Sequence, residues 1–137
     1  MAITGTTRLY AILGDPLARV RSPERFNALF AQYGTDAVLV PAEVGAAGFD
    51  AAIAGFKSLR NCDGLIITMP HKQAMCKHVD ELRDNGRLVG AINVARRSGC
   101  SMILRTGSSA FAASSSPKYM RVASPILMPR AASQKLM

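Results

Sequence analysis

The chain reads IITMPHK from Ile66 to Lys72, and the fold that we predict for the rest of the sequence follows from these seven residues. An apolar run ends at Thr68, a proline follows at position 70, and a lysine comes two residues later. We therefore expect a buried strand over residues 65–69, with Thr68 and Lys72 at its carboxyl end. Because open α/β sheets bind their ligands at that end of their strands, the stretch also predicts a ligand site.

Two more apolar runs and two helical patterns precede this stretch. The runs 9–13 and 37–41 are expected to be buried strands. Aromatic and aliphatic residues at helical spacing predict helices over 22–34 and 46–59. Ser22 followed by Pro23 is typical of a helix start in which the serine is the N-cap.

The pattern continues downstream of Pro70 with a short helix toward Lys77 and a further helical turn or two over 79–85. A fourth strand is expected over 88–94, interrupted by Gly90. Strands that alternate with helices predict an α/β fold with three layers (α/β/α) and a mainly parallel sheet, joined by right-handed crossovers.

The composition indicates a cytoplasmic protein without a membrane span. The chain has 137 residues, of which 49% are hydrophobic, and its longest apolar runs are too short to cross a bilayer. The first residues lack the basic and apolar regions of a secretory signal. Three cysteines at irregular spacing predict neither a disulfide framework nor a zinc site, so reduced thiols and no bound metal are expected.

The net charge of +8 is confined to one part of the chain. Residues 85–137 carry eight Lys or Arg and no acid, and nine serines fall within the last forty residues. We predict one domain over 1–98 and a low-complexity basic tail over 99–137, which is either disordered or the product of a shifted reading frame. Since no aromatic platform or recognised motif accompanies the charge, nucleic-acid binding is not expected.

Lys72 is the candidate for proton transfer. If Pro70 opens a helix, Lys72 lies in its first turn, where the positive end of the helix dipole disfavours the charged ammonium. That would favour the neutral amine that acid–base chemistry requires, although a solvated surface lysine is the alternative. The strand-to-helix turn is expected to direct His71 away from the site, into a structural role.

Three further residues are candidates for ligand contact. Ser22 begins a helix whose free N–H groups can hold a carboxylate, although a purely capping role is the alternative. Thr68 can direct its hydroxyl into the crevice, and Asn93 offers both a donor and an acceptor to a hydroxylated ligand. No Gly-x-Gly-x-x-Gly motif is present, so the sequence shows no dinucleotide site.

These segments occur in the order of the N-terminal, substrate-binding domain of the shikimate and quinate dehydrogenase family, which residues 7–98 resemble. The resemblance rests on four short motifs, GDP from Gly14, RSP from Arg21, TMPHK from Thr68 and GAIN from Gly90.

The resemblance implies a shikimate-dehydrogenase-like oxidoreductase that interconverts 3-dehydroshikimate and shikimate, or a related cyclohexene or cyclohexane acid. It implies that Lys72 is the catalytic residue and also contacts the substrate, and that Ser22, Thr68 and Asn93 bind the carboxylate or ring hydroxyls. NADP is the cofactor expected for the full-length family enzyme, bound by a separate Rossmann domain and not by this chain.

The sequence departs from the family pattern at three places. Val20 stands where the family usually has a serine, so one carboxylate ligand is lost, and Arg19 or Arg21 is a candidate to replace it with charge. Val94 stands where a threonine usually follows the asparagine. The catalytic aspartate expected about fifteen residues beyond Asn93 is missing, because no Asp or Glu follows Asp84.

The missing aspartate leads us to expect that this chain alone is inactive. A non-catalytic module that keeps the substrate crevice is the alternative function. We also consider homo-oligomer formation, because apolar strand ends that normally face a second domain would be exposed.

Overall fold

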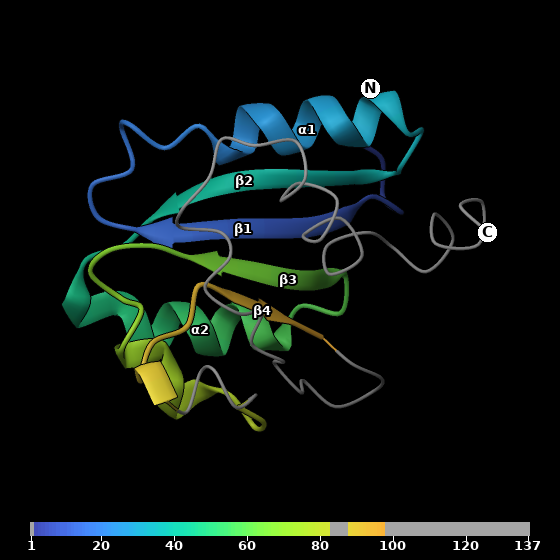
Figure 1. Ribbon diagram of the computed structural model, residues 1–137. Helices are drawn as coiled ribbons and strands as arrows, with labels where there is room; N and C mark the ends of the chain where they lie inside the picture. Colours follow the sequence, from blue (N-terminus) through green and yellow to red (C-terminus); the bar gives the residue numbers. More distant parts are fainter. Residues whose placement is uncertain (1, 83–87, 98–137) are drawn as a thin grey trace.

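Four strands form one sheet in the computed structural model, which describes residues 2–82 and 88–97 (Figure 1). The strands are β1 (Arg8–Gly14), β2 (Ala37–Glu43), β3 (Cys62–Ile67) and β4 (Val94–Arg96). The helices are α1 (Ser22–Gln32) and α2 (Phe49–Ser58), with two 3-10 helices, η1 (Ala46–Gly48) and η2 (Ala74–His78). The tail predicted over 99–137 lies outside the described residues.

The sheet has the strand order β2-β1-β3-β4 and is mainly parallel, as predicted. β1 pairs in parallel with β2 on one side and with β3 on the other. β4 pairs antiparallel with β3, from Gly64 opposite Arg96 to Ile66 opposite Val94. The prediction of a strand over 88–94 is therefore wrong in position, because Leu88 and Val89 are exposed and pairing begins only at Val94.

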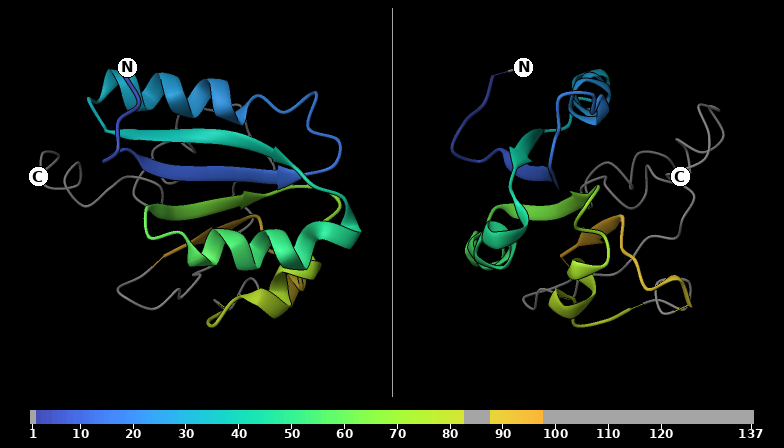
Figure 2. Two further views of the ribbon diagram at one scale, coloured as in Figure 1. Left: turned by 180° about the vertical axis from the view of Figure 1, so that it is seen from behind. Right: turned by 90° about the vertical axis from the view of Figure 1, so that its left-hand side faces the viewer.

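The two helices cover opposite faces of the sheet, which confirms the three layers (Figure 2). Successive side chains of a strand point to opposite faces. Tyr10 and Ile12 accordingly pack with Phe30 of α1, whereas Leu13 packs with Phe49 of α2. Both faces of β1 are thus buried, and this is why its sequence is an unbroken apolar run.

The start of α1 differs from the prediction by one residue. Its N-cap is Arg21, whose carbonyl accepts the N–H of Arg25 at 3.2 Å, and Ser22 is already inside the helix. The side chain of Arg21 makes no capping hydrogen bond to the first turn of the helix. Ser22 is therefore not the N-cap that the sequence suggested, and its hydroxyl does not cap the helix.

The segment after β3 is a turn followed by η2, not an α-helix opened by Pro70. An α-helix would require the Cys76 N–H to bond to the Lys72 carbonyl, but it bonds to the Gln73 carbonyl at 3.1 Å. The Lys72 carbonyl instead accepts the N–H of Ile92 at 2.9 Å. This long-range bond replaces the helical one, so the prediction that Lys72 lies in the first turn of a helix opened by Pro70 is wrong. Residues 79–82 are not helical either.

Candidate functional site

The carboxyl ends of β1, β2 and β3 lie at one edge of the sheet, on the left of Figure 1. The segments that follow these strands, 15–21, 44–45 and 68–73, meet there. Parallel strands joined by crossovers necessarily collect their carboxyl ends in this way. All four residues predicted to contact substrate lie in or next to these segments, and each is partly buried.

Backbone hydrogen bonds hold Lys72 and Asn93 beside the end of β3. The Ile67 N–H donates to the Asn93 carbonyl at 2.7 Å, and the Ile92 N–H donates to the Lys72 carbonyl at 2.9 Å. Because β4 runs antiparallel to β3, Asn93 lies opposite Ile67, the last residue of β3, and Thr68 follows Ile67 in the chain. The structure therefore brings the main chains of Thr68, Lys72 and Asn93 to the same end of β3, although 24 residues of sequence separate Thr68 from Asn93.

Hydrogen bonds also hold the main chain of Thr68 against the end of β1. Its N–H donates to the Leu13 carbonyl at 2.9 Å, and the Asp15 N–H donates to the Met69 carbonyl at 3.0 Å. Gly14 permits this close approach, because a Cβ there would overlap the Thr68 Cγ2 and lie 3.0 Å from the Met69 carbonyl oxygen. The Met69–Pro70 peptide bond is cis.

The helix α1 begins at the same edge of the sheet (Figure 1), and Ser22 is its first residue. Its neighbour Arg21 is exposed and binds the Glu24 carboxylate through both Nε and Nη2, at 2.8–3.0 Å. Val20 packs partly buried against the apolar cluster under α1. Arg21 is therefore engaged by its own helix, and Val20 adds no polar group to the edge.

His71, expected to point away from the site, lies in the core with 2% of its surface exposed. Its Nε2 lies 2.5 Å from the Val44 carbonyl oxygen, and its ring stacks on Phe49 with centroids 4.3 Å apart. Both partners lie more than twenty residues away in sequence. No local pattern could have identified them, and the sequence reasoning missed this contact.

A charged cluster joins η2 to the first turn of α2. The Asp50 carboxylate accepts from Lys77 Nζ and from His78 Nε2, each at 2.8 Å. The hydrogen bond from Lys77, followed by the one from His78, lowers the pKa of Asp50 below its ordinary value of 3.8. This cluster holds the segment that follows Lys72 against α2.

The described residues do not fit the NADP that the resemblance implies for the longer enzyme. A dinucleotide pyrophosphate is usually bound by free N–H groups in a glycine-rich turn between a strand and a helix. In the turn after β1, the Leu17 N–H already donates to the Glu43 carboxylate at 2.7 Å. A carboxylate at that point repels a pyrophosphate, so we assign no cofactor step to these residues.

Metal ligands do not cluster among residues 2–82 and 88–97, where no group of three or more His, Cys, Asp or Glu side chains is placed to hold an ion. Cys62 is buried, and burial raises the pKa of its thiol. Within the same residues, none of the helices is both long and apolar enough to span a bilayer.

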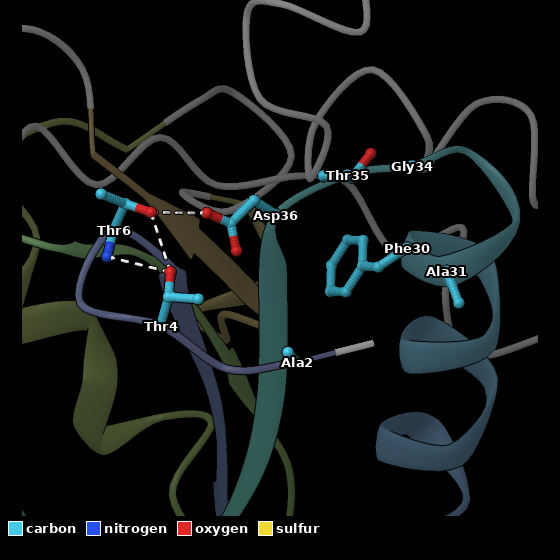
Figure 3. A pocket seen from close by; sticks show the side chains of 8 residues that line it. All are labelled: Ala2, Thr4, Thr6, Phe30, Ala31, Gly34, Thr35 and Asp36. Carbon is cyan, nitrogen blue, oxygen red and sulfur yellow. Dashed lines mark hydrogen bonds between the residues drawn. The ribbon is translucent and has the colours of Figure 1, made fainter.

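A hollow at the opposite end of the sheet is lined by residues of the N-terminal segment, the end of α1 and the start of β2 (Figure 3). Thr6 donates to the Asp36 carboxylate at 2.9 Å, and its hydroxyl lies 2.9 Å from that of Thr4. These groups bond to one another and tie the N-terminal segment to β2. The candidate site lies at the other edge.

Comparison with known proteins identifies the domain. A family model described as the shikimate dehydrogenase substrate binding domain matches residues 12–95. A shikimate dehydrogenase (NADP(+)) of Anaeromyxobacter dehalogenans is 42% identical over 95 residues, which are 69% of this chain and 34% of that protein. The chain spans about a third of the length of the curated relatives that it matches.

Two solved structures are similar over most of the chain. The shikimate 5-dehydrogenase from Listeria monocytogenes, in complex with shikimate and NAD, has a TM-score of 0.75 and 28% identity, covering 94% of this chain and 42% of that one. The 5-ketofructose reductase of a Gluconobacter strain has a TM-score of 0.70 and 25% identity, covering 76% of this chain and 36% of that one.

Proposed function

Because the chain belongs to the shikimate dehydrogenase substrate-binding domain family, we propose that it binds shikimate or a closely related cyclohexene or cyclohexane acid at the carboxyl edge of its sheet. The convergence of Thr68, Lys72 and Asn93, joined by the backbone bonds of Ile67 and Ile92, is the observation that carries this proposal. A relative of the same fold is known with shikimate bound.

The chemistry of the four side chains suits such a ligand. Thr68 and Asn93 offer a hydroxyl and an amide to the ring hydroxyls, and Ser22 offers a hydroxyl to the carboxylate. The Lys72 amine gives or takes the proton of the ring oxygen that changes between ketone and alcohol. For the longer protein we propose the NADP-dependent oxidoreduction named for the curated relatives, with the cofactor bound outside the described residues.

Titration of the purified chain with shikimate by isothermal calorimetry tests the proposal. We expect binding that Lys72→Ala weakens at least tenfold, because a charged hydrogen bond to the ligand is lost. Lys77→Ala is the matched control, since it removes the same charge from an exposed lysine bound to Asp50. Absence of shikimate binding, or equal loss in both variants, would contradict the proposal. If a longer form of the protein bound shikimate but did not oxidise it, that result would instead support the non-catalytic module.

A neutral polyhydroxylated ketone is the second candidate ligand. Two observations favour it: Val20 adds no hydroxyl where the family has one, and Arg21 is held by Glu24. A structural relative is named for its action on 5-ketofructose. Calorimetry with 5-ketofructose and shikimate in parallel separates the two candidates, because a site that has lost one of its carboxylate ligands should prefer the neutral compound.

A cytoplasmic location and self-association remain predictions. The location rests on the expectation of reduced thiols, and the self-association rests on exposed apolar residues. Met69 is 67% exposed and Leu88 is 85% exposed. Analytical ultracentrifugation of the chain over a concentration series tests whether it associates.

A further inference from the structure

The turn that carries Thr68 and Lys72 is attached to the rest of the domain through a buried histidine. We infer that His71 is a positioning residue, which fixes this turn against the segment after β2 and thereby sets where the side chains of Thr68 and Lys72 stand. The inference rests on the proposed function of that site. It concerns a residue that would act through its neighbours and would not touch the ligand.

The hydrogen bond to Val44 gives the imidazole a defined direction. The Val44 carbonyl can only accept, so the His71 Nε2 must carry the proton and donate across the 2.5 Å that separates them. Val44 is itself fixed, because its N–H donates to the Gly14 carbonyl at 3.1 Å. The bond therefore links the turn after β3 to the ends of both β2 and β1.

The stacking on Phe49 fixes the plane of the imidazole. The two rings are 4.3 Å apart and inclined by only 12°. Phe49 is 1% exposed and is the first residue of α2, so it belongs to the rigid core. A ring that is held both in its plane and along one bond has no freedom to rotate.

Backbone bonds carry this constraint to the candidate site. The His71 N–H donates to the Thr68 carbonyl at 3.0 Å, and the Met75 N–H donates to the His71 carbonyl at 3.0 Å. Lys72 is the next residue, and its carbonyl is bound by Ile92. The main chain is thus held on both sides of the Lys72 Cα, so the direction of the lysine side chain depends on His71.

Two variants separate positioning by the hydrogen bond from simple filling of the core. His71→Phe keeps an aromatic ring on Phe49 but cannot donate to Val44. His71→Gln has a terminal amide that can donate from nearly the same place as Nε2. We expect His71→Phe to weaken shikimate binding about tenfold, the size of one lost hydrogen bond, and His71→Gln to stay within about threefold of the wild type.

His78→Gln is the matched control, because it removes the other histidine on Phe49, whose ring meets Phe49 edge-on at 5.8 Å. Its shikimate affinity should equal that of the wild type. Unchanged binding in His71→Phe, or an equal loss in His71→Phe and His71→Gln, would overturn the inference.

A measurement without ligand separates this inference from the proposed function. In His71→Phe, the amide shifts of Thr68 and Lys72 should move, and His71→Gln should restore them. If the wild type fails to bind shikimate but the shifts behave in this way, the proposed function fails and the positioning role stands. If His71→Phe does not fold, 15N-labelled histidine in the wild type still decides, because a His71 Nε2 without its proton would overturn the inference.

Discussion

Gly14 lies where β1 meets the turn after β3, and it has no room for a side chain. An added Cβ would overlap the Thr68 Cγ2 and come within 2.9 Å of Leu17 Cδ2. We predict that Gly14→Ala lowers the free energy of unfolding by about 1–3 kcal/mol, the usual cost of overpacking, and also displaces Thr68. Urea denaturation measures the first effect and shikimate titration the second.

Gly55 is the matched control for that substitution. It lies inside α2, and a Cβ there would meet nothing within 4 Å. Gly55→Ala should raise the free energy of unfolding by about 0.5–1 kcal/mol, because alanine favours a helix interior more than glycine does. Equal effects of the two substitutions would contradict our account of Gly14.

The thiols of Cys62 and Cys76 should react at different rates. Cys62 is fully buried, and burial raises the pKa of its thiol, which reduces the reactive thiolate. Cys76 is only partly buried. In the folded chain near pH 8, we expect iodoacetamide to label Cys76 faster than Cys62, as measured by peptide mass spectrometry. In urea the two rates should converge, and faster labelling of Cys62 in the folded chain would refute the prediction.

The hydrogen bonds from Lys77 and His78 to Asp50 join η2 to α2, and their contribution to stability depends on pH. The pKa of its carboxyl is lowered by Lys77 and then by His78, so the unfolded chain binds a proton more readily than the folded one. The stabilisation is therefore present at neutral pH and is lost on acidification. The midpoint of thermal unfolding should be higher for the wild type than for Asp50→Asn near pH 6, and this gap should narrow as the pH falls from about 5 to below the ordinary carboxyl pKa of 3.8. A gap that stays constant over this range would contradict the prediction.

Arg97 joins the end of β4 to the end of α2. It donates through Nε to the Cys62 carbonyl at 3.0 Å and through Nη2 to the carbonyls of Lys57 and Leu59 at 3.0 and 2.7 Å. Arg97→Ala should lower the free energy of unfolding by about 1.5–3 kcal/mol, because three carbonyls, two of them in partly buried hydrogen bonds, lose a charged donor. Arg60→Ala, at an exposed neighbouring arginine, should change it by less than about 0.5 kcal/mol in the same urea series.

The sequence predicted the elements that are set by local periodicity. β1, α1, β2 and α2 were placed to within two or three residues, because each is an apolar run or an amphipathic repeat closed by turn residues. The prediction for the region after β3 was wrong, because the conformation of this region depends on a long-range hydrogen bond from the Ile92 N–H to the Lys72 carbonyl. β3 itself begins earlier than expected, since Cys62 and Gly64 are buried by pairing and not by an apolar pattern.

In the candidate site, too, the sequence predicted what a local motif marks and missed what depends on distant residues. Thr68, Lys72 and Asn93 could be identified by their places in short motifs, and the structure brings them together. The roles assigned to them remain predictions. His71 could be placed outside the site from its position in the turn. Its hydrogen bond to Val44 and its stacking on Phe49 could not be predicted, because they form only when distant segments come together in the fold.

Taken as one unit, the described part of the chain is a substrate-binding domain whose residues do not fit a dinucleotide cofactor. No Asp or Glu follows Asp84 in the sequence to complete an acid–base pair with Lys72. We predict no measurable reduction of NADP+ when the purified chain is mixed with shikimate or quinate, followed by absorbance of NADPH. Steady turnover above a heat-denatured control would refute this.

Apart from the buried His71 side chain, it is mainly the main chain that holds the candidate site together. Lys72 and Asn93 accept through their carbonyls, and Thr68 is fixed through both its N–H and its carbonyl. Every amino acid except proline has these same groups, so exchanging the side chains leaves the framework intact. The consequence is evolutionary: the ligand preference of this edge can drift by point mutation while the domain continues to fold, and a combinatorial library at these positions is a rational source of binders for new acids and polyols.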